Sequence, residues 1–186
     1  MTNLLVQGPE LEPVSVQQLR DYLRASADDD ALLTSLLTAA RIMIEAQTGL
    51  RLISQDWQVY VNRWTDGVIE LPIWPVQKIT AVKFLPEKAR TIDAGSYELV
   101  KVGRPALIDI KNAALPSALS ARLGVQIDLR AGYGDGPEDV PETLSFAVLA
   151  LAAHWYDIDD WNQYGLDQSI PPVVKTILDE YRMARI

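Results

Sequence analysis

The sequence predicts an α+β fold, mainly a helical bundle of about four helices with an inserted antiparallel β-rich middle region. Two patterns predict this fold class. Apolar residues recur at helical spacing near both ends of the chain, whereas apolar and polar residues alternate in short runs over residues 52–131. The chain has 186 residues, of which 48% are hydrophobic, and is long enough to bury one substantial core. We therefore expect a single domain over residues 1–186.

Two helices are predicted in the N-terminal third. The first covers residues 15–25, where Ser15 has the N-cap position and the apolar positions that recur are Val16, Leu19, Tyr22 and Leu23. The second covers residues 29–48 and ends at Gly49. Its predicted inner face consists of Leu33, Leu36, Leu37, Ala40, Met43, Ile44 and Gln47. Three aspartates, residues 28–30, precede it; they suit a cation site, but capping of the helix N-terminus is the favoured interpretation.

The middle of the chain predicts antiparallel hairpins. Alternation is clearest in residues 57–61 and 125–129, where Trp, Val, Ile and Leu occupy every second position. Prolines stand at the edges of the strand-like runs, where a missing amide donor is tolerated. They are Pro72, Pro75, Pro86, Pro105 and Pro116.

Two more helices are predicted at the C-terminal end. Residues 141–158 enter a helix at Pro141 and are apolar on nearly all faces from Leu144 to Trp155, which predicts a helix buried on every side. Residues 171–184 begin at two prolines and place four apolar residues on one face. These are Val174, Ile177, Leu178 and Tyr181, and the basic residues Arg182 and Arg185 follow them.

Composition excludes several classes of site. The chain has no Cys and one His, so it has no disulfide framework, thiol nucleophile or thiolate zinc site, and we expect neither a metal nor another cofactor. A net charge of −8 disfavours binding to nucleic-acid phosphates, although an acidic wall would let DNA pass without adhering. The N-terminus does not look like a secretory signal, and the longest apolar stretch is too short for a bilayer. A soluble protein without a membrane partner is expected.

The stretch "HWYDIDDW", residues 154–161, is the strongest candidate for chemistry. His154 and Asp157 share a helix face at i, i+3 and form a geometrically possible acid–base pair, as in a small hydrolase. There is no second His and no Ser in a nucleophile-elbow context, so the end of a core helix followed by a solvated acidic turn, with Asp159 and Asp160, is favoured.

Two further motifs are weak. "GYGDGP", residues 132–137, has the glycines of a phosphate loop but lacks the following Lys and Ser or Thr, so a sharp turn into the next helix is favoured. Trp57, Trp64 and Trp74 have too few basic neighbours for a groove that binds single-stranded nucleic acid. These tryptophans suit a core or a subunit interface instead.

The order of these segments resembles the head-to-tail connector (adaptor) family of tailed bacteriophages and gene transfer agents. The similarity runs from about Val14 to Tyr181 and is carried by "VSVQQLRDYLR", "DDDALLTSLLTAARIMIEAQTGLRLISQDW", "LPIWPVQKITAVKFL", "LRAGYGDGPEDVPETLSFAVLALAAHWYD" and "IPPVVKTILDEYR". The glycine-rich turn, the valine-proline entry and "AHWY" together are its most specific part.

The resemblance implies a non-enzymatic structural subunit. It would form a homo-oligomeric ring, usually twelvefold, beneath the portal protein ring in the neck of a virion or phage-like particle assembled in the bacterial cytoplasm. The ring would provide the platform for tail attachment, contact tail or stopper and other neck proteins, and let DNA pass its lumen without specific binding. His154 would then be a packing residue. Another neck or tail-completion protein is the alternative of the same kind.

The C-terminal helix is the candidate surface for the portal or for locking the ring. Its partner-binding residues would be Val174, Ile177, Leu178, Tyr181, Arg182 and Arg185. The alternative is that the apolar face simply closes the core of the monomer.

Overall fold

The computed structural model describes residues 1–62, 67–85, 90–101, 105–111, 124–158 and 170–182. These residues form two compact units. The β unit consists of residues 1–9 and 54–133, and the helical unit of residues 10–53 and 134–186. Each unit therefore combines segments that are far apart in the sequence.

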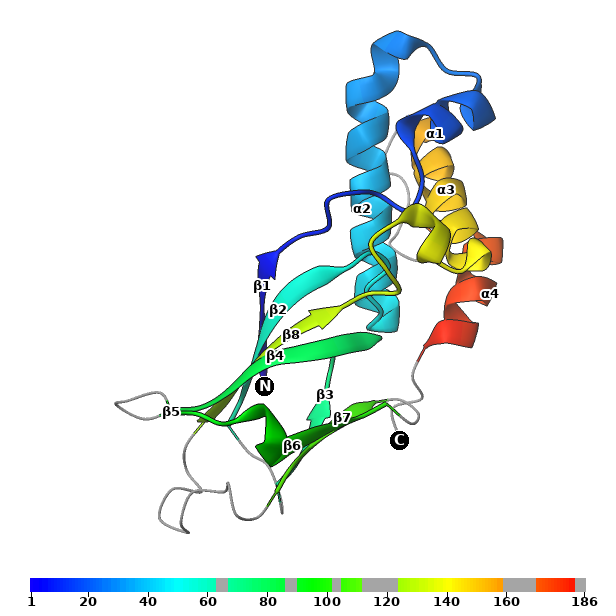
Figure 1. The fold of residues 1–186 in the computed structure, drawn as a ribbon. Helices are drawn as coiled ribbons and strands as arrows, with labels where there is room; N and C mark the ends of the chain where they lie inside the picture. The colour runs from blue at the N-terminus through cyan, green and yellow to red at the C-terminus, as the bar shows by residue number, and fades with distance from the viewer. Residues whose placement is uncertain (63–66, 86–89, 102–104, 112–123, 159–169, 183–186) are drawn as a thin grey trace. The chain divides into compact units, whose positions relative to one another are not determined.

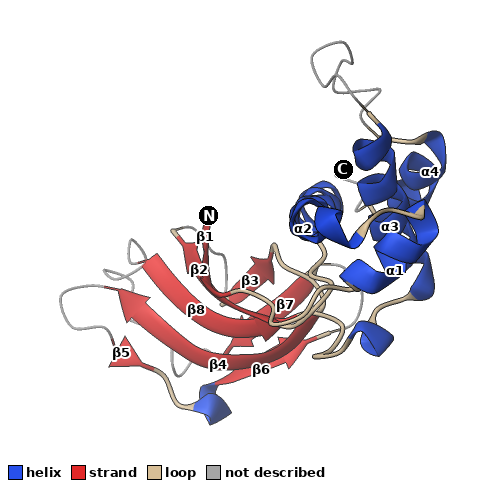
Figure 2. Cartoon of the chain, turned by 90° about the horizontal axis from the view of Figure 1, so that it is seen from above, coloured by secondary structure: helices blue, strands red, loops and turns tan. Residues whose placement is uncertain are grey.

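The β unit contains two antiparallel sheets (Figure 1). The five-stranded sheet has the order β1-β2-β8-β4-β5, and the three-stranded sheet has the order β3-β7-β6. The strands of the first sheet are β1 (Thr2–Gln7), β2 (Gln55–Val61), β8 (Gly124–Ala131), β4 (Val76–Leu85) and β5 (Arg90–Thr91). Those of the second are β3 (Val68–Leu71), β7 (Ala106–Ile110) and β6 (Tyr97–Val100). The long strands β2, β8 and β4 curve together as one layer (Figure 2).

The core of the β unit lies on one face of the five-stranded sheet. Strand β8 is buried at every second residue, because the register of β2 and β8 pairs Val59 with Ile127 and Val61 with Val125. Residues of both sheets join this core, including Ile69 and Ile108 from the paired strands β3 and β7. The opposite face of β2 and β8 carries polar side chains, so the predicted alternation is confirmed.

The helical unit contains α1 (Val16–Leu23), α2 (Asp30–Thr48), α3 (Glu142–Asp157) and α4 (Pro172–Tyr181). The long helix α2 lies beside α3, α1 contacts both, and α4 contacts α3 and α2 (Figure 1). The described residues also include three short 3₁₀ turns: η1 (Ala27–Asp29) and η5 (Pro137–Asp139) in this unit, and η2 (Ala94–Ser96) in the β unit. The largest fully buried side chains of the helical unit are Leu19, Leu33, Leu37, Ile44, Leu50, Leu52 and Ile53.

The α+β class and the four helices are confirmed, but the helices are not the main part of the molecule. In the part of the chain that the structure describes, eight strands in two sheets belong to a compact unit of their own, so "mainly helical bundle" is not confirmed. Strand β1 was not predicted, because no alternation marks "TNLLVQ". The single-domain boundary stays a prediction beside the two compact units.

Several details of the helices differ from prediction. Helix α3 is not buried on every side, since Phe146 is 43% exposed. Tyr22 on α1 and Gln47 on α2 lie exposed, although their spacing predicted the inner face. The reason is geometric: an apolar stripe at helical spacing is wider than the strip that the neighbouring helices cover. The helix signals themselves are confirmed, with Ser15 as the N-cap of α1 and Gly49 in the left-handed region at φ 74° after α2.

Candidate functional site

The apolar face of α4 packs inside the helical unit. Val174 and Leu178 are fully buried, and Ile177 and Tyr181 are half-buried. The Tyr181 hydroxyl lies 2.9 Å from Thr143 Oγ1 on α3. The structure therefore places two of the predicted partner-binding residues in the core of the unit, which is the alternative that the sequence left open for this face.

The basic end of α4 is partly held by its own unit. Arg182 donates from Nη2 to Gln47 Oε1 at 2.6 Å and from Nη1 to Asp179 Oδ1 at 3.1 Å, with about half of its side chain exposed. Arg185 lies outside the described residues. The exposed part of α4 that a partner can reach is Val173, Thr176, Asp179, Glu180 and Arg182.

The "HWYD" segment ends α3 and has a structural contact. Tyr156 donates its hydroxyl proton to Asp29 Oδ2 at 3.0 Å, which ties the end of α3 to the turn η1. This hydrogen bond, and burial to a lesser degree, raise the pKa of Tyr156 above its usual value. His154 is half-buried and Asp157 is exposed, while Asp159 and Asp160 lie outside the described residues. The geometry accounts for the segment as a helix end.

The three aspartates before α2 stabilise the turn η1 and anchor α1. The predicted side-chain capping of α2 is not observed, because its N-cap Asp29 makes no side-chain hydrogen bond to the helix. Asp28 and Asp29 form η1, whose N-cap Ser26 accepts from the Asp28 amide at 3.2 Å and donates its own amide to Asp29 Oδ2 at 3.3 Å. Asp30 makes a bidentate ion pair with Arg20 of α1, and this contact raises the pKa of Arg20. Within the described ranges, no group of three or more His, Asp or Glu could hold a metal ion.

A buried ion-pair cluster in the helical unit has no counterpart in the sequence prediction. Arg41, 6% exposed, donates from Nε to Glu12 Oε2 at 2.7 Å and from Nη1 to Glu45 Oε2 at 3.2 Å. Glu12 also accepts from Thr38 Oγ1, and Glu45 from the Leu52 amide, each at 2.9 Å. The i, i+4 spacing of Arg41 and Glu45 was the available signal, but such pairs are commonly solvent-exposed. The cluster therefore holds two segments against α2: the one that precedes α1 and the one that follows α2.

The glycine-rich stretch forms two tight features. In the β unit, Gly132 has φ 139° and donates its amide to Pro75 O at 2.9 Å, a conformation that favours glycine. In the helical unit, the Gly136 amide donates to Asp139 Oδ2 at 3.1 Å, and a Cβ on Gly134 would lie 2.0 Å from that oxygen. A carboxylate of the chain itself occupies the place where a phosphate would bind, so the predicted turn is the better description.

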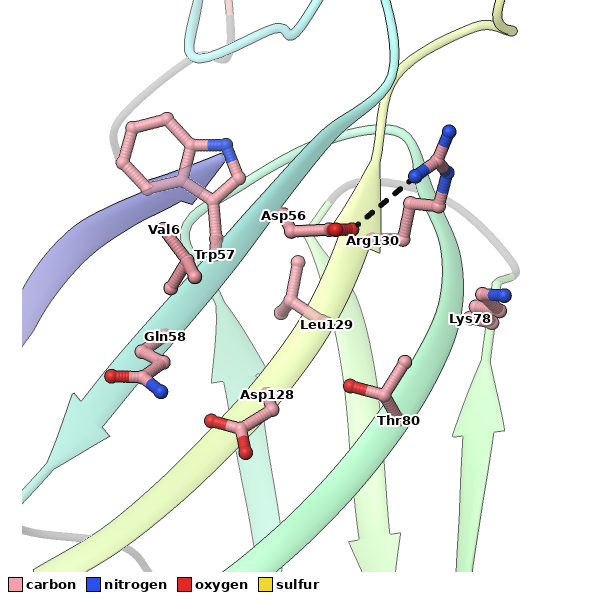
Figure 3. A pocket seen from close by; sticks show the side chains of 9 residues that line it. All are labelled: Val6, Asp56, Trp57, Gln58, Lys78, Thr80, Asp128, Leu129 and Arg130. Carbon is pink, nitrogen blue, oxygen red and sulfur yellow. Dashed lines mark ion pairs between the residues drawn. The ribbon is translucent and has the colours of Figure 1, made fainter. Parts of the chain in front are cut away.

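An open depression of about 300 Å³ lies on the polar face of the five-stranded sheet (Figure 3). Three of its charged side chains are paired: Arg130 lies 3.5 Å from Asp56, and Asp128 accepts from Lys83 and Gln126 at 2.7 Å each. Val6 of β1 borders it and is 58% exposed. Paired charges on an open sheet are suited to surface contacts rather than to a reaction.

A groove of about 490 Å³ lies in the helical unit. Its lining includes Pro13 and Val14 before α1, Phe146 and Leu149 of α3, and the polar residues Gln18, Glu138, Glu142 and Ser145. In the part of the chain that the structure describes, no helix is both long enough and apolar enough to cross a membrane.

Comparison with known proteins identifies the family. The model of the head completion protein family matches residues 12–184. Three solved structures are similar over 100% of this chain and 97% of theirs, each at 28% identity: the neck of an empty gene transfer agent (GTA) particle computed with C6 symmetry, with a TM-score of 0.83; the virion of a native GTA particle, also 0.83; and the neck of a native GTA particle computed with C12 symmetry, 0.82. Among curated proteins, none matches the chain. Because the family model covers nearly the whole sequence, the chain belongs to the head completion protein family.

Proposed function

We propose that this chain is a structural subunit of the neck, the junction between the DNA-filled head and the tail of a phage or phage-like particle. The observation that carries this proposal is the family match over residues 12–184, which includes most of both compact units. The GTA necks and virion, at 28% identity, have the same fold over the whole chain. The resemblance noted in the sequence and the structural rather than enzymatic role are thereby confirmed.

The finer proposal is a ring, usually twelvefold, that lies beneath the portal and carries the tail. The similar necks were computed with sixfold and twelvefold symmetry, which supports a ring of equal copies around the DNA axis. A net charge of −8 favours a lumen that repels the phosphate backbone, so DNA would pass through it without being held. Tail, stopper and other neck proteins would bind the opposite side of the ring.

Particles that carry this chain test the proposal directly. We expect cryo-electron microscopy of purified particles to show density for the chain only between portal and tail, in twelve copies. Particles made without the chain should contain filled heads that lack tails. Tailed particles formed at normal yield without the chain would contradict a neck role, and another copy number would contradict only the twelvefold ring.

For the portal contact, we propose the exposed end of α4 with Arg182 and Arg185. The buried positions Val174 and Leu178 would act by holding α4 in place. Arg185→Glu should weaken binding of the chain to isolated portal rings, because charge-assisted hydrogen bonds to a partner would be lost. Lys111→Glu, on an exposed side chain of the β unit, is the control with the same charge change. Equal binding of the two variants would remove the C-terminal end from the portal contact.

A further inference from the structure

Strand β1 is paired with β2, yet none of its residues is buried. All six of its residues are exposed. Leu4, Leu5 and Val6 are 53%, 46% and 58% exposed, and in the described ranges no other three consecutive large apolar residues are exposed together. A strand of this kind gains little from burial in the isolated chain. A surface of this composition is typical of an interface.

The outer edge of β1 can take another strand. In the sheet order β1 is terminal, and no described strand lies on its other side. Its register on β2 is regular from Thr2 opposite Tyr60 to Leu5 opposite Trp57, and shifts at an irregularity between Leu5 and Gln7. Soluble proteins usually protect such an edge with charged residues, proline or a very short strand. The sequence "TNLLVQ" has six residues and neither a charge nor a proline. Its main-chain groups therefore remain available for pairing by β-strand addition.

We propose that β1 is a contact between neighbouring copies of this chain, in which an extended segment of a second copy pairs along its outer edge and covers Leu4, Leu5 and Val6. This inference rests on the proposed ring. In a closed ring of more than two copies, two different patches of the chain meet at every interface. The partner of β1 thus need not be β1 itself, and every copy has another copy on each side.

Charge favours a second copy at this surface. Each copy has a net charge of −8, so copies repel one another wherever charged faces approach. Residues 1–9 contain no Asp, Glu, Lys or Arg, which makes this stretch a surface where two acidic copies meet at little electrostatic cost. Among the other exposed apolar residues, Tyr22, Leu32 and Ile42 stand singly on helices and provide no main-chain edge. Val68 lies on the terminal strand β3, but it is a single exposed apolar residue there.

Site-specific crosslinking tests the contact. The chain has no Cys, so Leu4→Cys creates a unique thiol that can carry a maleimide-benzophenone group. In particles assembled with the labelled chain, irradiation should produce covalent multimers of this chain. Mass spectrometry should find position 4 joined to a peptide from another copy. Ile42→Cys is the matched control, since Ile42 is 54% exposed against 53% for Leu4, and it should give at least fivefold fewer multimers. Crosslinks only to other particle proteins, or multimers equal to the control, would overturn the proposal.

A second pair of variants tests the same contact without a label. Leu4→Lys combined with Val6→Lys changes two exposed side chains, so the free chain should keep its circular dichroism spectrum and melting temperature while its incorporation into particles falls at least tenfold. Ile42→Lys should enter particles normally. Normal incorporation of the double variant would overturn the β1 contact. If the wild-type chain itself is absent from necks, the proposed function fails, and that result is distinct from a failure of β1 alone.

Discussion

At the residue scale, the side chains that composition made conspicuous have structural roles. The lone histidine, the acidic run and the glycine-rich loop suggested chemistry, yet Tyr156 anchors to Asp29, Asp30 anchors Arg20, and Asp139 occupies the glycine turn. Asp29, Asp30 and Asp139 therefore each have a partner within the chain. Three substitutions at this scale have measurable effects on stability.

The first concerns Trp155, which is 8% exposed on α3. Trp155→Ala should lower the free energy of unfolding by about 3 to 5 kcal/mol, because it removes a large buried aromatic side chain and leaves a cavity. Urea denaturation followed by circular dichroism measures the loss. A change below about 1 kcal/mol would place Trp155 on the surface of the folded chain.

The second concerns the Arg41 cluster. Arg41→Ala should cost about 3 to 5 kcal/mol of unfolding free energy, because Glu45, 5% exposed, would keep its buried charge after losing the ion pair with Arg41. Arg182→Ala is the control: its ion pair with Asp179 is exposed, and such pairs contribute about 1 kcal/mol or less. Chemical denaturation of both variants gives the comparison. Equal losses would show that burial of the Arg41 cluster does not matter for stability.

The third concerns the link between α3 and η1. The protonated Tyr156 hydroxyl donates to Asp29, and folding raises its pKa, so this stabilisation is complete below the unfolded pKa of about 10 and is lost as pH rises through the folded pKa. Tyr156→Phe should therefore lower the melting temperature at pH 7, and the difference from wild type should shrink above pH 10. A difference that is constant with pH would exclude the hydrogen bond as its cause.

At the scale of elements, local signals account for the helix boundaries better than for the strands. Ser15 makes a capping box with Gln18, each side chain bonding the other's amide at 3.1 and 2.8 Å. This signal needs only four consecutive residues. Strand β1 instead depends on β2, more than fifty residues further along the chain, and neither periodicity nor turn chemistry in "TNLLVQ" could indicate that pairing.

The capping box gives the prediction for this scale. Ser15→Ala should destabilise the helical unit by about 1 kcal/mol, since the amide of Gln18 would lose its acceptor at the start of α1. Ser35→Ala is the matched control, because the Ser35 hydroxyl bonds only to Ala31 O within the turn of α2. Its effect should stay within about 0.5 kcal/mol. Thermal melts of both variants measure the difference. Equal melting curves would show that the Ser15 cap does not contribute to stability.

At the scale of the whole molecule, net charge determines how copies of the chain associate and how strongly they bind DNA. The chain is acidic overall, whereas strand β1 is both uncharged and exposed. Copies of this acidic chain repel one another in solution. They can still meet in a neck if the contact is made at an uncharged surface such as β1. The same charge determines how the protein meets DNA.

We expect weak binding to duplex DNA at about 150 mM salt, because a net charge of −8 gains little from counterion release. Fluorescence anisotropy with a labelled duplex of about 30 base pairs, repeated at several salt concentrations, measures it. Binding tighter than about 1 μM with a steep salt slope would show a basic surface that dominates the net charge.

The α+β class, the four helices, the caps Ser15 and Gly49, the β-rich middle and the family could be predicted from the sequence, because each depends on local periodicity or on the order of motifs along this chain. Three features could not: α4 buries Val174 and Leu178, Arg41 lies inside with Glu12 and Glu45, and residues 2–7 form a sheet edge. These features join residues separated by tens of positions. A one-dimensional pattern states which residues prefer burial, but the packing of distant segments decides which of them are covered and which remain for a partner.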